Sequence, residues 1–172
     1  MITQNAQMAD ILIENILQNY SDMVYRLAYA RTKNKADAED LFQEVFLKCY
    51  KANIQFSCEE HCKAWLIRVT INLSKNILTS GWYKRILLKE APSEDLGGNG
   101  GHSPEDNKSE VFYAVMKLPE KYRLVVHLYY YEGYSVTEIA NILNRKDSTV
   151  KTQLFRARGL LKQNLKGEYD YV

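Results

Sequence analysis

The sequence between residues 135 and 162 reads SVTEIANILNRKDSTVKTQLFRARGLLK. Ser135 and Glu138 have the spacing of a capping box, in which the serine side chain accepts a hydrogen bond from the first helical turn and the glutamate reaches back. The polar residues 144–147 follow as a short turn, and Asn144 tolerates the left-handed conformation that such a turn often needs. A second apolar helical pattern comes next. The stretch therefore predicts a helix-turn-helix.

The second helix of this motif has the composition of a DNA-binding helix. Residues 145–166 contain seven lysines and arginines, and Asp147 is their only acidic residue. Lysine and arginine neutralise phosphates, arginine also reads guanine, glutamine reads adenine, and a threonine methyl group can contact thymine. Such a helix enters the major groove in helix-turn-helix proteins. The alternative interpretation is a helical hairpin whose basic face is merely solvated.

The rest of the chain shows helical periodicity as well, which predicts an all-α fold. Apolar residues recur at three- and four-residue steps through residues 13–28, 38–49 and 66–77. We expect Asn34 to cap the second helix and the third to begin near Cys62. A later helix is expected to have Pro119 in its first turn and to run until Gly133. Alternating strand patterns bounded by hairpin turns are not evident.

An acidic segment divides the chain in two. Residues 90–110 contain six acidic residues against one lysine, together with two prolines and the run GGNGG. Such a composition cannot bury a core and predicts a flexible linker. We therefore expect two small helical domains, residues 1–86 and 110–172, joined by a linker over residues 87–109.

The overall composition is that of an ordinary globular protein. The 172 residues are 46% apolar and 26% charged, with a net charge of +2. No apolar run is long enough for a membrane span, and the N-terminus lacks the pattern of a secretory signal. Three cysteines, an odd number, fit reduced thiols. These features predict a cytoplasmic protein without direct membrane insertion.

Patterns typical of catalytic or metal sites are weak. Cys58, His61 and Cys62 are close in sequence, but zinc sites usually need four ligands, and no second ligand pair is visible. No nucleophile with activating partners and no phosphate-binding glycine loop before a helix is found. We therefore expect no catalytic residue, metal, cofactor or small-molecule substrate. This argues against an enzyme, such as a recombinase, that borrows a helix-turn-helix.

Two blocks of the sequence resemble conserved regions of bacterial sigma factors. The block that resembles the fourth region comprises residues 118–123 (LPEKYR), 132–135 (EGYS), 138–140 (EIA) and 149–158 (TVKTQLFRAR). The block that resembles the second region comprises residues 37–48 (DAEDLFQEVFLK), Phe56, residues 64–68 (AWLIR) and residues 72–73 (NL). The blocks lie in the family's order with no third domain, which resembles the extracytoplasmic-function (ECF) type. The resemblance covers nearly the whole chain except the linker and both ends.

This resemblance implies core RNA polymerase and promoter DNA as partners and an anti-sigma factor as regulator. It also implies that the helix over residues 37–48 docks on a coiled coil of the largest polymerase subunit. The positions that carry over to this contact are Asp37, Asp40, Leu41, Gln43 and Glu44. Carboxylates there can pair with arginines of a partner helix, although a solvated acidic face is the alternative.

The resemblance further implies two DNA contacts. The minus-ten element would meet Lys63, Trp65, Arg68, Asn72 and Lys75, with residues 57–61 as a pocket for a flipped base. The minus-thirty-five element would meet Thr149, Lys151, Thr152, Phe155 and Arg156. Core packing is an alternative role for Trp65 and Phe155, because large aromatic side chains are usually buried. The apolar surface around Leu124, Leu128 and Tyr131 would dock on the polymerase flap, and the alternative is that it only seals the core of its own domain.

Two features depart from the family pattern. Arg145 stands where many relatives have an apolar residue, and Asn144 and Ser148 stand where many have glycine. Gln153 replaces a common arginine, which removes one phosphate or base contact. We expect the fold to survive and promoter preference to differ. The alternative function is a helix-turn-helix transcriptional regulator with an N-terminal dimerisation module, which need not bind core polymerase.

Overall fold

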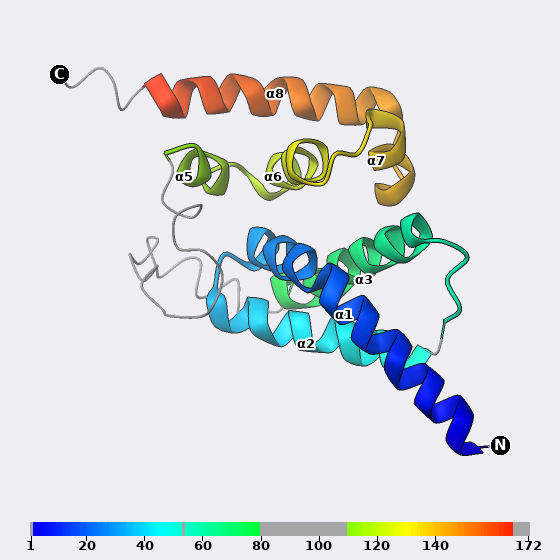
Figure 1. The fold of residues 1–172 in the computed structure, drawn as a ribbon. Helices are drawn as coiled ribbons and strands as arrows, with labels where there is room; N and C mark the ends of the chain where they lie inside the picture. The colour runs from blue at the N-terminus through cyan, green and yellow to red at the C-terminus, as the bar shows by residue number, and fades with distance from the viewer. Residues whose placement is uncertain (1, 53, 80–109, 167–172) are drawn as a thin grey trace. The chain divides into compact units, whose positions relative to one another are not determined.

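The computed structural model describes residues 2–52, 54–79 and 110–166, and all secondary structure in these ranges is helical. This confirms the expected all-α class. The predicted linker, residues 87–109, lies outside the described residues. The chain forms two compact units, Met1–Leu78 and Thr79–Val172, whose helices are drawn in Figure 1.

The first unit consists of α1 (Ile2–Thr32), α2 (Lys35–Ala52) and α3 (Glu59–Thr79). Long stretches of α1 and α2 lie side by side (Figure 1). The largest completely buried side chains of this unit come from all three helices and are Val24, Leu27, Leu41, Val45, Leu66 and Ile67. The apolar faces of the three amphipathic helices thus pack together and form one core.

A buried polar contact joins α1 to α3 inside this core. Arg31, which is 2% exposed, donates from Nε to Ser74 Oγ at 2.8 Å. Ser74 in turn donates to the carbonyl of Ile71 at 2.8 Å. A buried charge is tolerated only when it is hydrogen-bonded, so this contact defines how the two helices meet.

Local capping explains where the helices of this unit begin. The Asn34 side chain accepts a hydrogen bond from the Asp37 amide at 3.1 Å, which confirms the expected cap of α2. Lys33, just before it, takes the left-handed conformation with φ 58°. The third helix begins at Glu59, three residues before the predicted start at Cys62, because the Cys62 amide already donates to the Cys58 carbonyl at 3.1 Å.

Two of the three cysteines are buried in this unit, and their chemistry follows from that burial. Burial, with a smaller contribution from Cys49, raises the pKa of Cys62 to about 11, and burial also raises the pKa of Cys49. Cys58 is exposed. Because the thiolate is the reactive form, we expect iodoacetamide at pH 8 to modify Cys58 quickly and the two buried thiols slowly.

Mass spectrometry of the native and the guanidinium-unfolded chain would measure this difference. The labelling rate of Cys62 should rise steeply as the pH approaches 11, because the thiolate fraction grows. Fast labelling of Cys62 in the native protein at pH 8 would contradict the burial described here.

The second unit consists of α5 (Glu110–Met116), α6 (Glu120–Val126), a π-helical turn η2 (His127–Tyr131), α7 (Val136–Leu143) and α8 (Asp147–Lys166). The long α8 packs along α5, α6 and α7 (Figure 1). The centre of the core is formed by apolar side chains that are at most 1% exposed, namely Leu118, Val125, Leu128, Ile139, Val150 and Ala157. Arg123 is buried too, and it donates from Nη1 to the Leu118 carbonyl at 2.7 Å.

The helix predicted to run from Pro119 to Gly133 departs from expectation at both ends of α6. Pro119 is the residue before α6, one position earlier than expected. After Val126 the chain changes to η2, where the Glu132 amide donates to the His127 carbonyl at 3.2 Å. His127 stacks on Tyr131 within this turn, with ring centroids 5.3 Å apart. A π-turn adds a residue to the helical period, which an apolar pattern with a period of 3.6 does not reveal.

This arrangement corrects the expected flap-docking surface. Leu124 is 3% exposed and Leu128 is fully buried, so both belong to the core of the unit, and only Tyr131 is exposed. Leu124 and Leu128 do share one helical face, as their spacing indicates, but this face packs into the core of the unit and is not available to a partner.

The helix-turn-helix is present as predicted. Ser135 Oγ accepts from the Glu138 amide at 3.3 Å, and Glu138 Oε2 accepts from the Ser135 amide at 2.8 Å, which confirms the capping box. Asn144 ends α7 in the left-handed conformation with φ 51° and ψ 54°. Gly133, which precedes the motif, has φ 73°. The backbone path from η2 to α8 thus follows from local rules.

Removing the cap should weaken this unit measurably. We expect Ser135→Ala to lower the free energy of unfolding by about 1 kcal/mol, because the Glu138 amide loses the hydroxyl oxygen that accepts from it and the Glu138 carboxylate loses the hydroxyl that donates to it. Denaturant unfolding followed by circular dichroism is the measurement, with Ser148→Ala in the exposed first turn of α8 as the matched control. Equal stabilities for the two variants would show that the box contributes nothing.

Candidate protein and nucleic-acid interfaces

The helix α8 separates its side chains into a buried face and an exposed face. Val150, Leu154 and Ala157 are buried against the rest of the unit. Successive residues of an α-helix are turned by about 100°, which brings one group of exposed side chains together on the opposite face. This group, the recognition face, comprises Thr149, Lys151, Thr152, Phe155 and Arg156. The structure therefore assembles all five residues that were expected to meet the minus-thirty-five element.

Phe155 is the most informative residue of the recognition face. Its side chain is 76% exposed, which contradicts the alternative in which it packs into the core. An exposed phenylalanine one turn after Lys151 and Thr152 offers an apolar group for a thymine methyl, while these neighbours offer charged and polar groups. The recognition face therefore has the chemistry of a DNA-reading surface.

The charged turn before α8 is satisfied internally. Arg145 donates from Nη1 to Gln153 Oε1 at 3.0 Å, and Thr137 donates to Asp147 Oδ2 at 2.7 Å. The two departures at Arg145 and Gln153 therefore contact each other. Nothing in the sequence pattern indicates this pairing, because the residues are eight positions apart on different elements.

The exposed face of α2 forms a second candidate surface. Asp40, Gln43 and Glu44 are all exposed, and the helical period places Leu47 among them. Leu47 is 56% exposed, and it was absent from the residues expected at this surface, although the helical period that places it there could have identified it. We call these four residues the docking face.

Two residues predicted for this surface behave differently. Leu41 is fully buried, so its expected partner contact is wrong, and the residue is part of the core between the helices. Asp37 is only half-buried, and burial together with the nearby Asp40 raises the pKa of its carboxyl group. Two carboxylates one turn apart repel each other, and a cationic partner would relieve this repulsion.

The face of α3 predicted for the minus-ten element is largely assembled. Trp65, Arg68, Asn72 and Lys75 fall within a narrow arc of the helix. Lys75 donates to Asn72 Oδ1 at 3.4 Å, and Arg68 is exposed. Lys63 does not join them, because the helical period turns it toward the opposite, mostly buried side. Its grouping with the other four is therefore wrong.

Aromatic residues precede this face. The Phe56 ring makes edge contacts with the rings of Trp65 and His61, at centroid distances of 5.7 and 5.5 Å. The Trp65 side chain is half-buried. The Ser57 hydroxyl lies 3.2 Å from His61 Nδ1. Since α3 begins at Glu59, the second half of the segment predicted as a loop, residues 57–61, is the first turn of a helix. Trp65 therefore combines packing on Phe56 with partial exposure.

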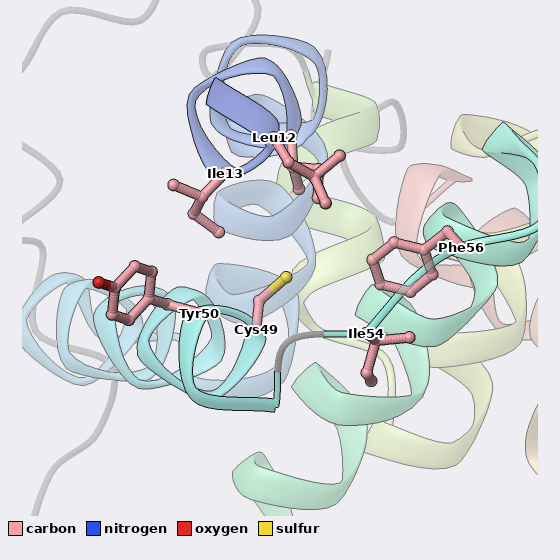
Figure 2. Close-up of a pocket in the computed structure, with 7 residues that line it drawn as sticks. Leu12, Ile13, Cys49, Tyr50, Ile54 and Phe56 are labelled. Carbon is pink, nitrogen blue, oxygen red and sulfur yellow. The ribbon is translucent and has the colours of Figure 1, made fainter. Parts of the chain in front are cut away.

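An apolar notch lies where α1 passes the end of α2 (Figure 2). It is lined by Leu12, Ile13, Ile16, Cys49, Tyr50, Ile54 and Phe56, and its volume is about 20 Å³. Small-molecule sites usually enclose about 300–1,000 Å³, so this notch accommodates nothing larger than a water molecule. In the ranges the structure describes, no three histidine, cysteine or acidic residues are grouped to hold a metal ion. Within those same ranges no helix is long and apolar enough to cross a membrane.

Comparisons with known proteins match the two units separately and the chain as a whole. Residues 16–84 match the model of Sigma-70 region 2, and residues 109–161 match that of Sigma-70, region 4. The ECF RNA polymerase sigma factor SigW of Bacillus subtilis (strain 168) is 32% identical over 164 residues, which cover 88% of each protein. SigM of the same organism is 36% identical over 160 residues, covering 87% of this chain and 93% of the relative.

One solved structure has a similar fold at low sequence identity. It is the sigma factor RpoE in complex with the anti-sigma factor NepR from Bartonella quintana. The TM-score is 0.69 at 20% identity, and the match covers 89% of this chain and 96% of that one. This likeness concerns the fold alone.

Proposed function

Because the chain belongs to the ECF type of RNA polymerase sigma factors, which direct promoter recognition and transcription initiation, we propose that two exposed helix faces divide this work. The docking face of α2 binds core RNA polymerase, and the recognition face of α8 reads the minus-thirty-five element. The single observation that carries the proposal is the recognition face, where an aromatic residue that is 76% exposed stands among basic and hydroxyl side chains.

The docking face supports the first half of the proposal. Asp40, Gln43 and Glu44 lie one to two turns before the exposed Leu47 on the same face, so an apolar side chain stands beside polar and acidic ones, as is usual in protein interfaces. Acidic residues there would pair with arginines or lysines of the polymerase and orient the encounter. An ordinary solvated helix face does not need an exposed leucine beside its charged residues.

The exposed face of α3 supports a role in strand separation. Arg68 and Lys75 can contact phosphates of a separated strand, and Trp65 presents part of its ring for stacking on a base. Asn72 lies between them and offers hydrogen bonds to base edges. We propose that these four residues, without Lys63, meet the minus-ten element.

The proposed activity needs no catalytic group of this chain. The protein acts by binding, and polymerase performs the chemistry. Core polymerase is a cytoplasmic enzyme in bacteria, so we place the chain there. We also propose an anti-sigma factor as regulator, by analogy with the solved complex of RpoE and NepR. The domain limits are proposed as residues 1–86 and 110–172, with residues 87–109 as the tether.

Run-off transcription with purified core polymerase tests the proposal. Genomic fragments would be transcribed with and without the full-length chain, and start sites would be mapped. We expect defined starts that depend on the chain, together with co-elution of the chain and core polymerase. A helix-turn-helix regulator would bind DNA without co-eluting with core polymerase, and that result would favour the alternative function.

A further inference from the structure

An open hollow lies beside the recognition face, between α6 and the start of α8. Its volume is about 290 Å³. It is lined by two residues of α6 and five of α8, namely Lys121, Tyr122, Ser148, Thr149, Thr152, Gln153 and Arg156. None of the lining residues is acidic, and two are cationic. The hollow shares Thr149, Thr152 and Arg156 with the recognition face, so the two surfaces are continuous.

The cationic groups of the hollow converge on one phenol. The Tyr122 ring is buried, while its hydroxyl reaches the surface. Hydrogen bonding with Arg156, and the nearby Lys121 charge, lower the pKa of this hydroxyl. Lys121 Nζ also lies 5.0 Å from the centre of the Tyr122 ring. Two cations held close to each other repel, and an anion bound between them would relieve that repulsion.

Arg145 determines which group Gln153 offers to the hollow. Its Nη1 donates to Gln153 Oε1 at 3.0 Å, so the carbonyl oxygen of the glutamine amide is occupied. The amide nitrogen, which carries two N–H donors, is the end left for a ligand. The hollow thereby presents cations and hydrogen-bond donors, which is the chemistry of a phosphate site.

We propose that this hollow binds one phosphate of the DNA backbone beside the bases that α8 reads, with Lys121, Tyr122, Gln153 and Arg156 as its contacts. Arg145 is a positioning residue that acts through Gln153. The inference rests on the proposed function of α8. A DNA phosphate fits better than a free anion, because the hollow is open to solvent and adjoins the recognition face, so its ligand would arrive tethered to the duplex.

Neutralising single phosphates tests the proposal in the intact complex. Holoenzyme made from core polymerase and the full-length chain would be titrated with promoter fragments, obtained from the run-off experiment, that carry one methylphosphonate each around the minus-thirty-five element. We expect one position at which the neutral linkage weakens binding of the wild-type holoenzyme by about tenfold. Lys121→Gln should weaken binding of the unmodified fragment, and its response to the neutral linkage at that position should be smaller than that of the wild type, because one of the contacts to this phosphate is already missing.

Salt dependence provides a second readout. The slope of log K against log salt should fall by about 1 for Lys121→Gln, as expected for one lost phosphate contact. Lys162→Gln removes the same charge from an exposed site further along α8 that does not line the hollow. This control should keep its full response to the methylphosphonate position.

The positioning role of Arg145 predicts a non-additive pair. Arg145→Leu and Gln153→Ala should each reduce the methylphosphonate effect, and the double variant should equal Gln153→Ala alone. A merely structural role would instead lower the unfolding midpoint and leave the methylphosphonate response unchanged. Additive losses from the two changes would overturn the positioning role.

The remaining outcomes separate this inference from the proposed function. If the wild-type holoenzyme bound no promoter fragment, the proposed function itself would be lost. If it bound, but Lys121→Gln kept the wild-type response at every phosphate, only the hollow would be refuted. Inorganic phosphate at millimolar concentration should not saturate the hollow of the free chain, in a titration followed by the NMR signals of its tyrosines. Tight saturation there would assign the hollow to a free anion and overturn the DNA assignment.

Discussion

Asp40→Arg is expected to remove the association of the chain with core RNA polymerase. The residue lies exposed on the docking face of α2, one turn before Gln43 and Glu44. A carboxylate that pairs with a partner cation contributes to both encounter and residence, and the reversed charge would repel that cation. The expected loss is about 2–5 kcal/mol of binding free energy, the range measured when one member of an interfacial charge pair is removed. Co-elution and surface-based binding kinetics with core polymerase measure it.

The controls for this variant come from the same unit. Glu14→Arg makes the same reversal at an exposed position of α1 outside the docking face, and its binding should remain near wild type. Leu47→Ala should weaken association with no change of charge, because an exposed leucine loses its contact area. Circular dichroism would verify that α2 is intact in each variant. Wild-type affinity of Asp40→Arg would place the polymerase contact on another surface.

Arg156→Ala is expected to weaken binding of the holoenzyme to the minus-thirty-five element by about 1–3 kcal/mol. Arg156 belongs both to the recognition face and to the hollow, where it meets the Tyr122 hydroxyl. If it reads a base, the loss should be confined to promoters with that base, and specificity at one position should relax. If it contacts phosphate alone, all sequences should lose affinity equally. Filter binding over a set of single-base promoter variants distinguishes the two roles.

Arg158 provides a matched control on the same helix. Its Nε donates to the Tyr130 hydroxyl at 2.8 Å, and its guanidinium lies 5.9 Å from the ring centres of Tyr129 and Tyr130. Arg158→Ala therefore removes one positive charge that is already engaged within the unit. Its promoter affinity should change little. If the two arginine variants lost the same affinity, the effect would reflect net charge, and the special position of Arg156 would be disproved.

The local features of the helix-turn-helix were predictable because their causes are local. A capping box depends on residues three positions apart, and the turn depends on the conformational tolerance of Asn144. The recognition face also follows from the period of one helix, since α8 has a single buried stripe. The family resemblance added the partners, which no periodicity can supply.

Other features needed contacts between distant segments. Arg31 and Ser74 are 43 positions apart, and only the packing of α3 beside α1 buries this arginine and brings its Nε to the Ser74 hydroxyl at 2.8 Å. The π-turn η2 likewise interrupts the register that the apolar pattern implied for residues 119–133. In each case the neighbouring element, rather than the pattern, decides which side chain is covered.

Sequence alone determined the all-helical class, the helix-turn-helix with its caps, and the membership suggested by two ordered motif blocks, because all of these depend on residues within one or two helical turns. The tertiary structure alone decided that Arg31 is buried beside Ser74 and that a π-turn interrupts residues 119–133. It also brought Lys121 and Tyr122 to Arg156, and Arg145 to Gln153. The physical reason is that burial and charge pairing are properties of surfaces in contact, and those contacts join residues that the chain separates.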